Sequence, residues 1–446
     1  MLLWSVQFRV SGKRAKEFRL HADRSLRKLR HSPAARAKLR APASTLAPFP
    51  ADISSFALFN GSPTLAPYYG INGRSNPKWG YVEQWNFDIQ RQLPAGFFAD
   101  VAYAGSHGVH LQQYSTNIDQ LPDTLWSQAG ALTVQVPNPM GVSATNPLGT
   151  NPNPSLNGAT VAAGQLERPY PQYNGLSLAG YGCCESSYHS LQATVTRRFQ
   201  GGGTLLVAYT NAKLLSNTDT LTSWLEGPTG GVGGVQDWNN LKGERSLSSQ
   251  DVSQRLVISY VLDLPFGHGR AYAANLTGIA DKMVSGWGID GITTFQRGFP
   301  LKITQPGQTA LEAANLGVSN IRPDVVPGCN RKAGGGHLSQ WFNTSCFATP
   351  PDWGFGTESR TDSILRTPGI NNFDFAVFKR TMIGERIDIE FRTEFFNLFN
   401  HPYFSPPGTA FAGSATANGF GQVTSTVPSG VASPERLIQF ALKFVF

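Results

Sequence analysis

Residues 436–446 read Arg436-Leu-Ile-Gln-Phe-Ala-Leu-Lys-Phe-Val-Phe446, and this stretch decides the fold class. One set of alternate positions is apolar, whereas the other set includes Gln439 and Lys443. A period of two is the pattern of a β-strand, and a tilted strand of about 9–11 residues crosses a bilayer. The stretch therefore predicts a membrane-spanning strand. A half-buried edge strand of a soluble sheet is the alternative.

The aromatic face of this terminal strand is expected to point to lipid. A slip of one residue would turn Lys443 toward lipid, at a cost of roughly 2–4 kcal/mol near the midplane. The chain ends on a phenylalanine. We expect the outward residues to form the signal read by the barrel-assembly machinery: Phe446, Phe444, Leu442 and Phe440.

The composition favours strands that are only half apolar. Charged residues make up 15%, aromatics 11%, and the mean hydropathy is −0.21, with 47 glycines and 30 prolines. No stretch of the sequence approaches the 18 apolar residues of a membrane helix. A closed antiparallel β-barrel is the other way to satisfy the backbone across a bilayer.

The basic charge belongs to the first part of the chain. The net charge is +8, yet residues 1–45 hold twelve Lys or Arg against Glu17 and Asp23. We expect residues 1–45 to be a disordered or non-native leader and residues 46–79 a linker, with the barrel at 80–446. The leader lacks interleaved aromatics and a recognition motif, so no nucleic-acid partner is expected.

Nine strands are predicted from alternation, and their connections alternate between shorter and longer. Outer-membrane barrels have short periplasmic turns and long extracellular loops, which fixes the direction of each strand. Nine is odd, so we expect a missing upstream strand and an incomplete part of a larger barrel. The predicted strands are Tyr81–Arg91, Phe97–Ala104, Tyr188–Phe199, Thr204–Lys213, Gln254–Leu264, Trp287–Arg297, Asn372–Arg380, Arg386–Phe396 and Arg436–Phe446.

The candidate site residues include a charge ladder and four cysteines. We interpret the ladder as mutually neutralising charges on a water-facing wall, with acid/base catalysis as the weaker alternative. No catalytic signature, metal spacing or cofactor motif occurs, so an enzyme is not expected. Cys329 and Cys346 can close a loop disulfide, whereas the adjacent Cys183 and Cys184 are expected as free thiols. The ladder comprises Arg386, Asp388, Glu390, Arg392 and Glu394.

Several ordered motifs over residues 79–446 resemble the C-terminal barrel of Oar-like TonB-dependent outer-membrane receptors of the acidobacterial type. The motifs include Ser187-Tyr-His-Ser-Leu-Gln192, Leu262-Asp-Leu-Pro-Phe-Gly267 and Phe391-Arg-Thr-Glu-Phe-Phe-Asn-Leu-Phe-Asn-His-Pro402. Residues 84–94 and 101–108 complete the set. The resemblance implies a 22-stranded barrel preceded by a signal peptide, an immunoglobulin-type domain and a plug. This sequence departs from that pattern before the later barrel strands.

The resemblance implies uptake of a large substrate across the outer membrane of a Gram-negative bacterium. The expected partners are outer-membrane lipid, the assembly machinery, the unknown substrate and, only through a plug, TonB. One alternative is a structural or adhesive outer-membrane protein without transport. A second is a soluble extracytoplasmic β-sandwich or carbohydrate-active enzyme, which would extract into buffer without detergent.

Overall fold

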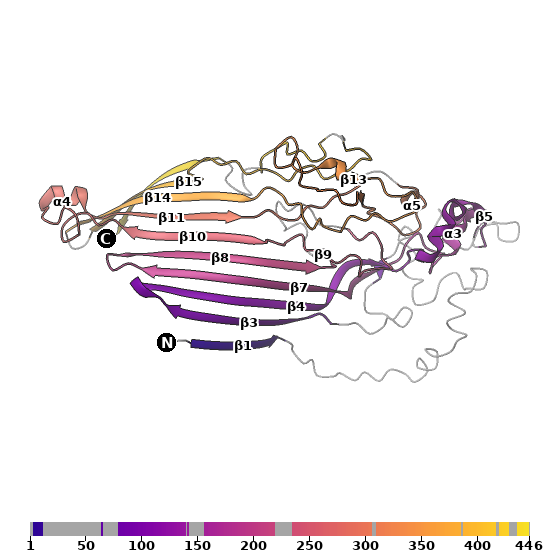
Figure 1. Cartoon of the computed structure of the whole chain (residues 1–446), viewed down its shortest axis with the longest axis horizontal. Coiled ribbons are helices and arrows are strands. Elements are labelled where there is room, and N and C mark those ends of the chain that lie inside the picture. Colours follow the sequence, from indigo (N-terminus) through magenta and orange to yellow (C-terminus); the bar gives the residue numbers. More distant parts are fainter. Residues whose placement is uncertain are drawn as a thin grey trace.

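The computed structural model describes residues 3–11, 64–65, 79–139, 141, 156–218, 234–305, 309–384, 387–415, 419–427 and 435–445. The chain is mostly β, and its main strands run antiparallel to their neighbours (Figure 1). The predicted all-β antiparallel class is confirmed. No helix in these ranges is long and apolar enough to cross a membrane.

One open sheet carries the chain, and its strands follow the sequence order from edge to edge. Short strands β2 (Thr64–Leu65) and β9 (Ser246–Leu247) pair with β7 and β8. The path runs through β1 (Leu3–Ser11), β3 (Tyr81–Gln92), β4 (Phe97–Asn117), β7 (Ser177–Arg198), β8 (Gly203–Ser216), β10 (Gln254–Asp263), β11 (Trp287–Gln296), β14 (Ile370–Ile383), β15 (Ile387–Phe396) and β16 (Leu437–Val445).

The nine strands predicted between Tyr81 and Phe446 are all present, but several are longer than expected. Strand β4 continues to Asn117, and β7 already begins at Ser177. Their pairing shifts register between Gly108 and Gln112, where the alternation of side chains is interrupted. The run of Gly, Ser and His residues there carries no clean period, which is why the sequence pattern ended early.

The structure differs from the expectation for the leader at Leu3–Ser11. Strand β1 pairs antiparallel with β3, with Leu3 opposite Gln90 and Ser11 opposite Val82. The sequence from Trp4 to Val10 alternates apolar and polar residues, as an edge strand does. Residues 12–45, and residues 46–63 and 66–78 of the expected linker, lie outside the described residues.

The two faces of the sheet follow the sequence alternation. In β16, Phe440, Leu442 and Phe444 share one face with Phe391 of β15, while Lys443 lies opposite Glu390. We call the face with Phe440 the outward face and the face with Lys443 the inward face. The registers extend this division from β16 back to β3.

Three cross-strand pairs set an aromatic ring over a glycine. A Cβ atom added at Gly105 would lie 2.4 Å from the indole of Trp85, its partner on β3. The same relation holds for Gly288 with Phe378 and Gly291 with Tyr260. Cross-strand contacts of this kind fix strand register, and the missing Cβ provides the space for the ring.

Long connections gather at one end of the sheet, and the N- and C-termini lie at the other (Figure 1). The long connections are residues 118–176, 217–253, 297–369 and 397–436. We call their described parts the loop assembly. Their short elements are η5 (Asp123–Thr133), β5 (Gln135–Pro137), β6 (Thr160–Ala162), α3 (Ala163–Leu166), α5 (Ala310–Ala313), β12 (Asp324–Val325), η8 (Thr344–Cys346) and β13 (Phe347–Ala348).

The loop assembly has hydrophobic cores of its own. One core joins the connection after β11 with the connection after β15, through Phe342, Phe347 and Phe420. A second core joins the connection after β4 with the one after β11, through Leu121, Leu316 and Trp126. The long connections are therefore folded against each other and not separate polar loops.

Candidate functional site: the loop assembly and the inward face

The inward face of β15 carries the predicted charge ladder. Arg392 lies 2.6 Å from Glu394 on its own strand and 2.8 Å from Asp290 on β11. Ala376, buried, separates Asp290 from Glu394 in the cross-strand row. A small side chain at this position allows one guanidinium to reach carboxylates on both sides.

The other members of the ladder are arranged differently from the sequence interpretation. Glu390 takes its partner from β14, where Arg380 Nε lies 3.1 Å away. Asp388 is in register with Val445, and its Oδ1 is buried without a hydrogen-bond partner. Arg386 lies outside the described residues. Neutralisation thus comes largely from neighbouring strands, which a pattern within one strand does not reveal.

The terminal aromatics share one exposed face, but only in part within the described chain. Phe440 is 69% exposed, and Leu442 and Phe444 are exposed as well. Phe446 lies outside the described residues. The role of these four residues as an assembly signal stays a prediction.

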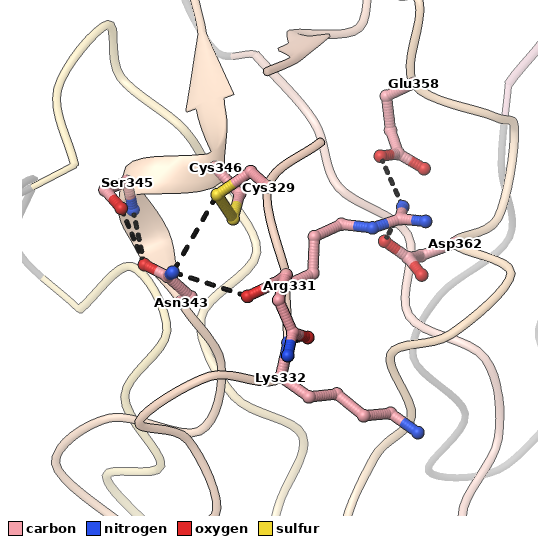
Figure 2. The surroundings of a disulfide bond; sticks show 9 residues. Cys329, Arg331, Lys332, Asn343, Ser345, Cys346, Glu358 and Asp362 are labelled. Atoms are coloured by element: carbon pink, nitrogen blue, oxygen red, sulfur yellow. Dashed lines mark hydrogen bonds and ion pairs between the residues drawn. A yellow bond between two sulfur atoms is a disulfide. The ribbon is translucent and has the colours of Figure 1, made fainter. Parts of the chain in front are cut away.

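The disulfide Cys329–Cys346 closes part of the connection after β11, with the two Cα atoms 5.5 Å apart (Figure 2). Two residues beyond Cys329, the Arg331 guanidinium lies 3.1 Å from Glu358 Oε2 and 2.5 Å from Asp362 Oδ2. Both carboxylates are fully buried. The disulfide therefore fixes the backbone near Arg331, and the guanidinium of this arginine bridges two carboxylates.

The expectation of free thiols at Cys183 and Cys184 is wrong, because the structure joins them in a disulfide. Cys184 pairs with Leu111, whereas Gln112 already pairs with Gly182. Cys183 is thus the extra residue of a bulge in β7. The bulge depends on how β7 pairs with β4, so two adjacent cysteines in the sequence alone do not indicate it.

Burial and like charge raise the pKa of Glu358 to about 7. Burial is the larger cause, the neighbouring Asp362 adds to it, and Arg331 opposes both. The same cause acts at the Asp119–Arg168 pair, 2.8 Å apart with both side chains fully buried. Burial raises the pKa of Asp119 to about 7 even though Arg168 favours its ionised form.

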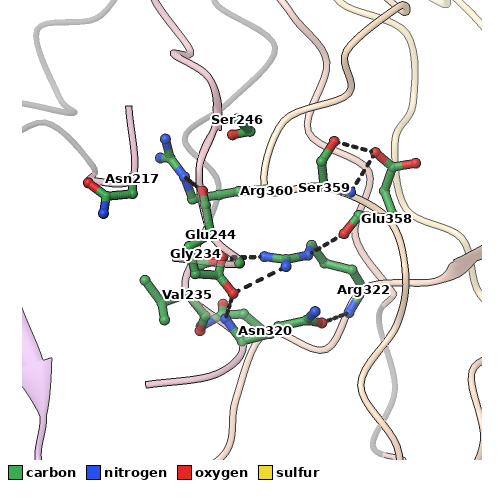
Figure 3. Close-up of polar contacts among 12 residues, drawn as sticks. Asn217, Gly234, Val235, Glu244, Ser246, Asn320, Arg322, Glu358, Ser359 and Arg360 are labelled. Atoms are coloured by element: carbon green, nitrogen blue, oxygen red, sulfur yellow. Dashed lines mark hydrogen bonds and ion pairs between the residues drawn. The ribbon is translucent and has the colours of Figure 1, made fainter. Parts of the chain in front are cut away.

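A second arginine network ties the loop assembly to the strand ends (Figure 3). Arg322 donates to Glu244 over 2.7 and 3.2 Å, and its Nε donates to the Glu358 carbonyl over 2.8 Å. Arg360, almost fully buried, donates to the carbonyl of Ser216, the last residue of β8, over 2.9 Å. Sequence reasoning missed these arginines because their partners lie between 36 and 144 positions away.

A cavity of about 290 Å³ lies among these connections. It combines basic, acidic and amide side chains with two isoleucines, which suits a polar group of a ligand. Groups of three or more His, Cys, Asp or Glu residues that could hold a metal do not occur in the described ranges. The lining residues are Gly234, Lys302, Ile303, Thr304, Gln305, Glu312, Asn320, Ile321, Arg322 and Arg360.

Comparison with known proteins gives one family and several remote structures. The family described as "Outer membrane beta barrel domain" matches residues 25–439. No curated protein matches in sequence. The outer membrane transporter YddB from Escherichia coli is 8% identical, with a TM-score of 0.36, and the match covers 86% of this chain and 34% of YddB.

Two further solved structures have similarly low scores. The copper transporter OprC is 7% identical with a TM-score of 0.32, covering 85% of this chain and 33% of OprC. FpvA of P. aeruginosa, solved with heterologous pyoverdines and iron, is 9% identical with a TM-score of 0.29, covering 82% of this chain and 27% of FpvA. The chain thus spans about a third or less of the length of these structures.

Proposed function

Because the chain belongs to the outer membrane β-barrel domain family and lies in the outer membrane, we propose that it acts in uptake of a large substrate. It supplies strands of the wall and external loops of a transporter of the TonB-dependent, Oar-like kind. TonB acts on such a transporter through a plug domain and not on the strands. The sequence motifs quoted above support the finer assignment.

The observation that carries the proposal is a charged inward wall beneath a folded loop assembly. The wall carries ion pairs such as Arg392 with Asp290, which suits contact with water. The loop assembly has its own cores and a polar cavity, so it offers a fixed surface to a ligand. A substrate would meet the loop assembly first and the wall afterwards.

The connection after β11 allows a direct test. Phe299 and Thr367 are joined by two hydrogen bonds, of 2.8 Å from the Thr367 N–H and 2.9 Å from the Phe299 N–H. Residues 300–366 can therefore be replaced by an Asn-Gly turn with β11 and β14 still paired. The variant, the unchanged gene and the gene deletion are compared in the native host, at equal surface levels.

The readout is the set of compounds that cells accumulate from a complex medium, with and without a protonophore. The proposal expects at least one compound whose energy-dependent accumulation is lost on deletion and reduced in the loop variant. Identical accumulation by wild-type and deletion cells would refute transport.

An adhesive protein without transport is the second candidate, because the loop assembly alone would serve attachment. It predicts that the loop variant attaches less to surfaces or cells while accumulation is unchanged. The two readouts, taken on the same strains, separate the candidates.

A further inference from the structure

The outward face carries cations at the end of the sheet where the shorter connections lie. Arg91 is near the end of β3, Arg197 near the end of β7, and Lys379 lies on β14 opposite Trp287. Each sits at an outward position, since each shares a cross-strand row with outward residues. In strands β3 to β16, no outward position within five residues of this end holds Asp or Glu.

Arg197 is held between two aromatic rings. Its guanidinium carbon lies 4.8 Å from the ring centre of Phe97 and 4.7 Å from that of Phe199. Phe97 is its cross-strand partner on β4, and Phe199 follows two positions along the chain. Two flanking rings fix the plane of the guanidinium and leave its edge as the direction in which it can donate.

Nε of Arg197 has no acceptor among the described residues. This atom is buried, and the outward positions around it are apolar: Ala99, Val195 and Leu205. A buried guanidinium donor without an acceptor is costly. Lys379 differs, because its Nζ donates to the Ser285 carbonyl over 2.6 Å.

We propose that Arg197, between Phe97 and Phe199, binds the headgroup phosphate of a phospholipid in the membrane leaflet at the short-connection end. A planar guanidinium donates to two phosphate oxygens at once, and the rings contact the first carbons of the acyl chains. The occupant is a lipid and not a free anion, because Arg197 lies on the apolar face of the sheet that carries Val195 and Leu205. Arg91 adds attraction for the same layer of phosphates.

The test uses the full chain in a nonionic detergent without phosphate. Native mass spectrometry measures retention of phosphatidylglycerol against a diacylglycerol with the same acyl chains. The wild type should retain phosphatidylglycerol in preference, and Arg197→Gln should weaken that retention roughly tenfold, as expected for loss of a charge-assisted pair. Arg198→Gln is the matched control, since Arg198 is the next residue and points to the inward face.

Each result of this experiment either supports or overturns the proposed lipid site. Equal retention of the two lipids by the wild type, or equal loss in Arg197→Gln and Arg198→Gln, overturns the proposal. Displacement of the lipid by millimolar inorganic phosphate shows a free-anion site and also overturns it. If Arg197→Gln does not fold, Arg197→Lys keeps the charge without the planar donors and should bind more weakly than the wild type; unchanged binding contradicts the geometry.

Discussion

Arg392 of β15 donates from Nη2 to Oδ1 of Asp290 on β11, across 2.8 Å and over the intervening strand β14. The same guanidinium donates from Nε to Glu394. One arginine therefore compensates carboxylates on two strands of the wall. The contact fixes β11 and β15 relative to each other without a backbone hydrogen bond between them.

Replacing Arg392 should destabilise the sheet more than replacing its exposed neighbour Arg380. Arg392→Met removes the cation that compensates Asp290 and Glu394. We expect the free energy of unfolding to fall by about 2 kcal/mol, a value between those typical of exposed and of buried ion pairs. Arg380 is 54% exposed, so Arg380→Met should cost less than about 1 kcal/mol. Urea unfolding in lipid vesicles measures both; equal effects would contradict the bridge.

The loop assembly should be more stable in mild acid than in alkali. The folded state raises the pKa of Glu358 from 4.5 to about 7, so the folded form holds the proton more tightly. Stability should fall as pH rises from about 4.5 to 7 and stay low above that. Asp119 acts in the same direction.

The measurement is cleavage of the loop assembly by a protease that is active from pH 5 to 8, corrected for its own pH profile. The side chain in Glu358→Gln cannot ionise, so the cleavage rate of this variant should depend less on pH. The pH dependence that remains should be the part due to Asp119. A wild-type cleavage rate that is constant over this range would argue against the raised pKa values.

Removing the Cys329–Cys346 disulfide should loosen the connection after β11. The cysteines are 17 positions apart, and cross-linking a loop of this length stabilises by about 3 kcal/mol in the chain-entropy account. The double variant Cys329→Ser, Cys346→Ser should be cut faster by thermolysin between these positions. Cys183→Ser with Cys184→Ser is the control and should leave that cleavage unchanged.

Adding a methyl group at Gly105 should displace the Trp85 ring. The new Cβ would lie 2.4 Å from the indole, which forces a shift at a cost of about 1–3 kcal/mol. A Cβ at Gly130 meets no atom within 4 Å, so Gly130→Ala is the control. Equal unfolding free energies for the two variants would show that the ring moves without cost.

The orientation of β16 can be tested by thiol labelling. Phe440 lies on the outward face and Gln439 on the inward face. A membrane-impermeant reagent should label Phe440→Cys poorly and Gln439→Cys well in membranes, and the native cysteines are paired in disulfides. Stronger labelling at position 440 would reverse the assignment of the faces.

The strands could be predicted from the sequence because each one carries its own period. Ile438 to Phe444 alternates without reference to any partner, and the same holds for β3 and β8. The loop assembly could not be predicted, since Arg322 finds Glu244 and Arg331 finds Asp362 only after folding. The sequence predicts loops for the long polar connections because their buried residues, such as Phe342 and Phe420, follow no period.

The charge ladder of β15 could be predicted only in part. Its charges were predicted on one face, yet the partner of Glu390 is Arg380 on the next strand. Which face a residue occupies depends on its own strand, whereas its ion pair depends on register. Register in turn depends on contacts such as Trp85 over Gly105, which are visible only in three dimensions.

Glu358 joins two segments of the connection after β11, and Arg322 extends this link to the connection after β8. The carboxylate of Glu358 accepts a hydrogen bond from Arg331 in the disulfide-closed segment. The backbone carbonyl of Glu358 accepts one from Arg322, which also donates to Glu244 in the connection after β8. Movement of the segment around Arg331 can therefore reach the connection after β8 through Glu358 and then Arg322. A bound ligand that displaced the segment around Arg331 would shift residues 244–247 with it, and the end of β8 would move together with the loop assembly.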